Sequence, residues 1–127
     1  MSGQSIQILI IEDDTANQML VRDVLESNGY SCAAVDSAEE GLRLAEELTP
    51  ALILLDIKLP GMDGVTAAHH LKHAPATQAI KLIGMSAHAM VNEVALIETA
   101  DFDYFITKPF SYKSLLKIVQ AALSVES

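Results

Sequence analysis

The chain has 127 residues, 50% hydrophobic and 5% aromatic, which is enough for one domain over residues 1–127 with an aliphatic core. A formal net charge of −9 argues against nucleic-acid binding, because contacts with phosphates need lysine and arginine. No apolar run has transmembrane length, and the first residues lack the basic region of a signal peptide, so we expect a cytoplasmic protein without membrane contact.

Apolar runs alternate with amphipathic stretches five times along the chain. Strands are predicted at residues 6–11, 31–35, 51–55, 80–85 and 103–107. Helices are predicted at residues 15–28, from the capping box that begins at Ser37 to about residue 48, near 65–73, near 89–99, and from Ser111 to about 124. This (βα)5 alternation favours a parallel sheet with helices on both faces. Cys32, the single cysteine, lies in the second strand and is predicted to be a buried small hydrophobe.

Polar side chains follow four of the predicted strands. Glu12 and Asp13 come after the first strand, Asp56 after the third, Ser86 after the fourth and Lys108 after the fifth. Ligands of open α/β sheets bind at the carboxyl ends of the strands, where these residues would meet. Three carboxylates, one hydroxyl and one ammonium at one edge suggest a divalent cation together with a phosphoryl group.

Each of these residues also has a simpler interpretation. The acids at 12 and 13 could serve a helix N-terminus, although Asp14 or Thr15 can cap that helix alone, and we weigh metal binding and capping equally. Asp56 follows four apolar residues and is either a loop cap or a nucleophile, since carboxylates form acyl phosphates. Lys108 could extend to solvent, but the following proline can adopt a cis bond and redirect it.

Three histidines lie on the third predicted helix. His69 and His73 have the i, i+4 spacing of metal ligands, but no glutamate or cysteine of a known zinc pattern accompanies them. We therefore interpret them as solvated or partly packed side chains.

Four motifs, taken together and in order, resemble the receiver domains of bacterial two-component response regulators. They are Ile-Ile-Glu-Asp-Asp at 10–14, Leu-Leu-Asp-Ile-Lys-Leu-Pro-Gly-Met-Asp-Gly at 54–64, Met-Ser-Ala-His-Ala-Met at 85–90, and Tyr-Phe-Ile-Thr-Lys-Pro-Phe at 104–110. The resemblance covers essentially the whole chain. It implies a flavodoxin-like, doubly wound fold with five parallel strands in the order 2-1-3-4-5.

The resemblance also implies a role for each site residue. Asp56 would accept the phosphoryl group, and Ser86 and Lys108 would bind it, with a cis bond between Lys108 and Pro109. Asp13 and Asp56 would touch Mg²⁺ directly, Glu12 would act largely through water, and Lys58 would offer its backbone carbonyl. Phe105 would be the aromatic switch residue, and Asp101 stands where the family usually has glycine.

The expected function is phosphorelay signalling rather than enzymatic turnover. The phosphoryl group would come from a sensor histidine kinase, a histidine phosphotransfer protein or acetyl phosphate. Phosphorylation would change the face formed by the fourth helix, fifth strand and fifth helix, and so control a downstream protein. Two other functions are disfavoured. A phosphohydrolase would need a second acid where this chain has Lys58, and an FMN carrier would need a Ser/Thr/Gly-rich loop after the first strand, where this chain has acids.

Overall fold

The computed structural model describes residues 6–59, 61–86 and 101–124. Its strands are β1 (Ile8–Ile11), β2 (Cys32–Val35), β3 (Leu52–Asp56), β4 (Lys81–Ser86) and β5 (Tyr104–Thr107). Its helices are α1 (Thr15–Ser27), α2 (Ala38–Leu48), α3 (Gly64–Lys72) and α5 (Tyr112–Ser124). The helix predicted near residues 89–99 lies outside the described residues. The predicted strands and the other four helices are confirmed to within two residues at each end.

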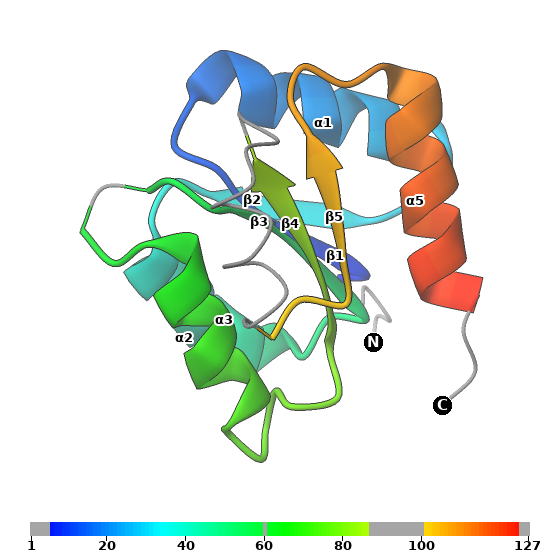
Figure 1. The fold of residues 1–127 in the computed structure, drawn as a ribbon. Helices are drawn as coiled ribbons and strands as arrows, with labels where there is room; N and C mark the ends of the chain where they lie inside the picture. Colours follow the sequence, from blue (N-terminus) through cyan, green and yellow to red (C-terminus); the bar gives the residue numbers. More distant parts are fainter. Residues whose placement is uncertain (1–5, 60, 87–100, 125–127) are drawn as a thin grey trace.

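The five strands form one parallel sheet in the order β2-β1-β3-β4-β5, as predicted (Figure 1). The register aligns Ile11 of β1 with Leu55 of β3, and Asp56 with Met85 of β4. Ser86, at the end of β4, aligns with Thr107 of β5. The last residues of four strands therefore lie side by side at one edge of the sheet.

Helices cover both faces of the sheet: α1 and α5 lie on one face, and α2 and α3 lie on the other (Figure 1). Alternate residues of the central strands point to opposite faces, so Ile8 and Ile10 join one core while Leu9 and Ile11 join the other. All four are fully buried. This explains why the central strands are unbroken apolar runs rather than alternating ones.

Local signals in the sequence explain where the helices begin and end. Asp14 caps α1 by accepting the N–H of Asn17 at 3.0 Å, and Gly29 takes a φ of +92° just beyond its end. Ser37 accepts the N–H of Glu40 at 3.2 Å at the start of α2, while the carboxylate of Glu40 pairs with an arginine of the same helix. Similar side-chain caps begin α3 and α5 at Asp63 and Ser111.

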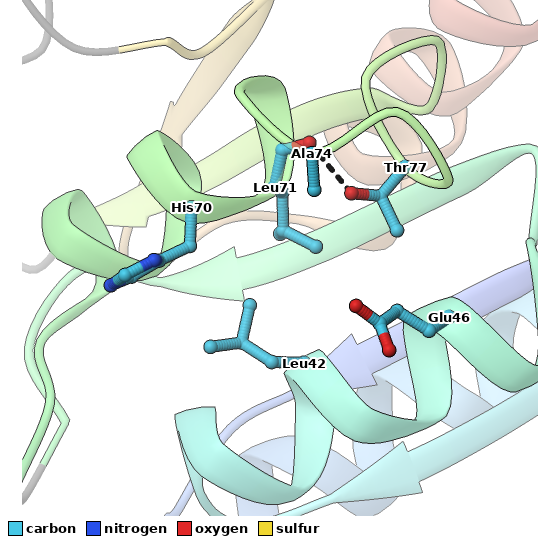
Figure 2. A pocket seen from close by; sticks show the side chains of 6 residues that line it. All are labelled: Leu42, Glu46, His70, Leu71, Ala74 and Thr77. Carbon is cyan, nitrogen blue, oxygen red and sulfur yellow. Dashed lines mark hydrogen bonds between the residues drawn. The ribbon is translucent and has the colours of Figure 1, made fainter.

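A cavity of about 160 Å³ lies between α2 and α3. Figure 2 shows Leu42 and Glu46 of α2 facing Leu71 and Thr77 across it, with His70 at its rim. The Thr77 hydroxyl is buried and donates to the backbone carbonyl of Leu71 at 2.6 Å. Its polar group is therefore already satisfied within the fold.

None of the helices in the described part of the chain is long and apolar enough to cross a membrane.

Cys32 is buried in the core between the sheet and α1, as predicted. Burial, followed by the charge of Glu26, raises the pKa of its thiol from 9.0 to about 11. The thiolate is the reactive form, so at pH 8 the native protein should hold about 100-fold less of it than an ordinary cysteine. We expect reaction with Ellman's reagent to be correspondingly slow in buffer and fast in urea. A Cys32→Ser protein carrying Ser27→Cys, at an exposed position, should react rapidly in both conditions.

Candidate functional site

The predicted site residues meet at the carboxyl edge of the sheet. Of the four buried polar or charged residues among those described, Glu12, Asp56 and Ser86 lie at this edge. Glu12 directly follows β1, while Asp56 and Ser86 are the last residues of β3 and β4. Burial of polar groups is unfavourable unless they have partners, so three of them at one edge of the sheet indicate a functional site.

Lys108 connects the two buried acids. Its Nζ lies 2.9 Å from Oε1 of Glu12 and 3.0 Å from Oδ2 of Asp56. The side chains of Glu12 and Asp56 are 0% and 7% exposed, and that of Lys108 is 21% exposed. One ammonium thus serves two carboxylates in a region largely shielded from water, where charge interactions are stronger than at the surface.

The start of α1 also holds Glu12. The side-chain amide of Asn17 donates to Oε1 of Glu12, and the N–H of Asp14 donates to Oε2 at 3.1 Å. Gln18 donates to the backbone carbonyl of Glu12 at 2.9 Å. The loop from β1 to α1 therefore fixes both the backbone and the carboxylate of Glu12.

The three charged groups perturb one another. Burial raises the pKa of Asp56 to about 7, and its hydrogen bond with Glu12 adds to the effect, while Lys108 opposes it. Burial also disfavours the charged form of Glu12, but hydrogen bonds with Asp56 and Lys108 outweigh it, so the pKa of Glu12 is lowered. Burial opposes the charge of Lys108 too, yet the two carboxylates raise its pKa overall. The site thus has more negative charge than Lys108 neutralises.

Asp13 completes an acidic cluster at this edge. Oxygen atoms of Glu12, Asp13 and Asp56 all lie within 4.8 Å of one another, with Asp13 exposed and the other two buried. Carboxylate oxygens are the ligands that Mg²⁺ prefers, and it commonly keeps several waters, which suits a cluster open on one side. The donor set therefore fits a hard divalent cation.

The loop after β3 holds the Asp56 carboxylate. The N–H of Lys58 donates to Oδ1 of Asp56 at 3.1 Å, and the N–H of Gly64 donates to the carbonyl of Ile57 at 2.8 Å. A Cβ on Gly64 would lie 2.2 Å from the carbonyl oxygen of Asp56. The chain therefore returns so closely against β3 that only glycine fits at this position.

Ser86 and Lys108 are joined through the backbone at the end of β4. The N–H of Lys108 donates to the carbonyl of Ser86 at 2.6 Å, and the Lys108–Pro109 bond is cis, as the resemblance implied. Phe105, two strand positions before Thr107, is 38% exposed on β5. Residues 87–90 of the motif at 85–90, His88 among them, lie outside the described residues.

Sequence reasoning brought these residues to one edge but did not predict their pairing. The amide of Asn17 on Glu12 was missed, although its position in the first turn of α1, opposite the end of β1, was an available signal. The sequence predicts Lys108 as a ligand for a phosphoryl group and gives no sign that its ammonium also bridges Glu12 and Asp56.

Known proteins resemble this chain along most of its length. It is 33% identical over 116 residues to the polar-differentiation response regulator DivK of Brucella ovis, covering 91% of this chain and 94% of that protein. It is 29% identical over 122 residues to the sensor protein GacS of Pseudomonas syringae, covering 94% of this chain but only 14% of GacS. Relatives therefore include both a protein of similar length and one part of a much longer protein.

A solved structure has the same fold. The receiver domain of a sensor histidine kinase from Pseudomonas aeruginosa PAO1, which holds a magnesium ion in its active-site cleft, matches with a TM-score of 0.88 at 26% identity. The match covers 95% of this chain and 99% of that one. Residues 8–120 match the family described as the response regulator receiver domain, in which phosphoryl acceptance and Mg²⁺ binding are typical. This chain belongs to the family of response regulator receiver domains.

Proposed function

We propose that the whole chain is one receiver domain, in which Asp56 accepts a phosphoryl group. The observation that carries this assignment is the position of Asp56, buried at the end of the central strand β3 with Lys108 Nζ 3.0 Å from its Oδ2. Asn17 and Asp14 hold Glu12 beside it. The carboxylate of Asp56 is thus fixed at the end of a strand, and a carboxylate in such a position can act as a nucleophile.

In the proposed reaction, an oxygen of Asp56 attacks the phosphorus atom of the donor. A new P–O bond forms while the bond from phosphorus to the donor breaks, and the donor leaves with that electron pair. Lys108, which already lies between two carboxylates, binds an oxygen of the transferred group, and the Ser86 hydroxyl binds another. Lys108 therefore exchanges part of its pairing with Glu12 and Asp56 for the phosphoryl oxygens.

We propose that Asp13, Asp56 and the backbone carbonyl of Lys58 hold Mg²⁺, with Glu12 acting through water. Bound there, Mg²⁺ would supply the positive charge that lets a carboxylate approach a phosphoryl dianion. The close approach of the three acids supports this proposal, as does the excess of negative charge over Lys108.

Receiver domains are signalling domains rather than conventional enzymes, and they act with histidine kinases or phosphotransfer proteins and with downstream targets. For this chain we propose a phosphohistidine or acetyl phosphate as the donor, slow self-catalysed loss of the phosphoryl group, and a cytoplasmic protein target. The exposed Phe105 on β5 supports placing the responsive surface around β5 and α5. Lys58 is exposed and stands where a phosphohydrolase would need an acid, which disfavours that alternative.

The proposal is tested by incubating the protein with acetyl phosphate and Mg²⁺ and measuring its intact mass. We expect one added phosphoryl group per chain, lost on mild base treatment as an acyl phosphate should be. Replacing Mg²⁺ with an excess of EDTA should abolish the addition, because the acids then repel the incoming phosphoryl group. Equal labelling with and without Mg²⁺ would contradict the proposed metal site, and absence of labelling would contradict the proposed reaction.

A further inference from the structure

Two histidines and an aspartate form a second cluster on the surface beside α3. His69 lies in α3, His73 caps its C-terminus, and Asp101 lies three residues before β5. Asp101 precedes a strand, whereas the residues around Asp56 lie at the carboxyl ends of strands. Because the sheet is parallel, the two clusters lie at opposite ends of its strands. The second cluster is therefore separate from the proposed phosphorylation site.

The side chains of this cluster lie close enough together to hold one metal ion. Nδ1 of His69 lies 3.4 Å from Oδ2 of Asp101, and Nδ1 of His73 lies 3.9 Å from the same oxygen. Each residue offers a ligand atom within 4.8 Å of the others. Two ligand atoms on a tetrahedral Zn²⁺ with bonds of about 2.0–2.1 Å lie roughly 3.3–3.4 Å apart. His69 and Asp101 therefore already have the spacing of two ligands of one ion, and His73 lies close enough to supply the third.

Helical geometry arranges the two imidazoles. The i, i+4 spacing places His69 and His73 on one face, and their ring centroids are 4.0 Å apart with an interplanar angle of 30°. Nδ1 of His73 lies 2.8 Å from the backbone carbonyl of His69, which can only accept a hydrogen bond. This hydrogen bond places the proton on Nδ1 of His73, so His73 would bind a metal through Nε2, and the 3.9 Å separation from Asp101 belongs to its other ring nitrogen. A carbonyl that fixes the tautomer in this way is a common feature of metal-binding histidines.

The backbone that carries Asp101 is anchored beside α3. Lys72, the last residue of α3, pairs with Asp103 at 2.9 Å and also donates to the carbonyl of Ile80. Asp103 in turn exchanges two hydrogen bonds with Leu82: its N–H donates to the Leu82 carbonyl at 2.9 Å, and its carboxylate accepts the Leu82 N–H at 2.9 Å. These contacts fix the backbone two residues beyond Asp101 beside α3 before any metal binds, which lowers the entropy cost of forming a site.

Ion pairing alone gives a weak reason for this arrangement. The side chains of His69 and His73 are 66% and 59% exposed, and surface pairs of this kind contribute little stability. Two imidazoles and one carboxylate are instead the donor set of borderline divalent metals, whereas Mg²⁺ prefers oxygen alone. We propose that His69, His73 and Asp101 bind a divalent transition-metal ion such as Zn²⁺, with water completing the coordination. This inference does not depend on phosphorylation of Asp56.

His70 provides a matched control on the same helix. It is also exposed, but it lies at the rim of the cavity between α2 and α3 (Figure 2), and the cluster with Asp101 contains His69 and His73 and not His70. A metal that bound histidines indiscriminately would affect His70 as much as its neighbours. Selective binding should leave it unaffected.

The experiment is a Zn²⁺ titration of the full chain, followed by the NMR signals of the histidine ring protons. Single His→Gln variants assign each signal. We expect the signals of His69 and His73 to shift together while that of His70 stays in place. His73→Gln and Asp101→Asn should each weaken the affinity at least about tenfold, the loss typical of a disturbed metal site, whereas His70→Gln should not.

Several results would overturn the proposal. One is the absence of any shift at His69 and His73 up to millimolar Zn²⁺. Another is an equal loss of affinity in His70→Gln and His73→Gln, which would indicate nonspecific binding. Unchanged affinity in Asp101→Asn would exclude the three-residue site. All of these side chains are partly or largely exposed, so the variants should fold, and circular dichroism melting would verify that each does.

Discussion

Replacing Asp56 with asparagine should abolish phosphorylation by acetyl phosphate in the presence of Mg²⁺. An amide oxygen cannot form the acyl phosphate that a carboxylate forms, although the side chain keeps its size and shape. The variant should still fold, because burial and Glu12 already raise the pKa of Asp56 to about 7 and so disfavour its charged form. Its melting temperature without Mg²⁺ should equal or exceed that of the wild type.

Asp14→Asn is the matched control for this experiment. Asp14 lies at the same edge of the sheet, but it is exposed and its carboxylate caps α1. Asparagine caps helices about as well as aspartate, so this variant should accept a phosphoryl group like the wild type. Labelling that persists in Asp56→Asn would show that another residue is the nucleophile.

Gly64→Ala should damage both stability and phosphorylation. The new Cβ would lie 2.2 Å from the carbonyl oxygen of Asp56 and 2.7 Å from the Cα of Ile57, and both are backbone atoms. Relief requires the loop between β3 and α3 to move, which also displaces the N–H of Lys58 from the Asp56 carboxylate. We expect a loss of about 1–3 kcal/mol in the free energy of unfolding, measured in urea. We also expect the rate of labelling by acetyl phosphate to fall by a factor of about 10 or more, since small displacements of reacting groups are costly.

Gly41→Ala tests whether this effect is specific. A Cβ on Gly41 would lie 2.3 Å from the Cδ1 atom of Ile11, which is the far end of a side chain that can rotate. Alanine also favours the helical backbone of α2 by about 1 kcal/mol. This variant should therefore lose less stability than Gly64→Ala and keep its labelling rate. A wild-type labelling rate in Gly64→Ala would show that the loop does not orient Asp56.

The sheet could be predicted from sequence because its central strands are buried on both faces. The runs around Ile8–Ile11 and Leu52–Leu55 are apolar without alternation, which indicates parallel strands between two layers of helices. Capping residues such as Ser37 placed helix ends accurately, since their hydrogen bonds are local. The predicted strand ends differ from the observed ones by up to two residues. A strand ends where its neighbour stops pairing, and that is not determined by local sequence.

The membership of the site could be predicted, but its internal contacts could not. Parallel topology alone brings Glu12, Asp56 and Lys108 to one edge. Which ammonium bridges which acids depends on the path of the backbone after each strand, and that is not visible in the sequence. The contact between Asp101 and His69 could not be predicted either. These residues lie far apart in the sequence and approach each other only after the sheet has formed.

Because Lys108 bridges Glu12 and Asp56, the site is complete only after the chain has finished folding. Lys108 is separated by 96 residues from Glu12 and by 52 from Asp56, so its ammonium arrives only when the last strand has joined the sheet. A nascent chain still missing its C-terminal strand, or a native chain whose β5 edge has opened transiently, presents the acids without their cation. Such molecules should not accept a phosphoryl group. Phosphorylation would then be restricted to molecules that have completed folding.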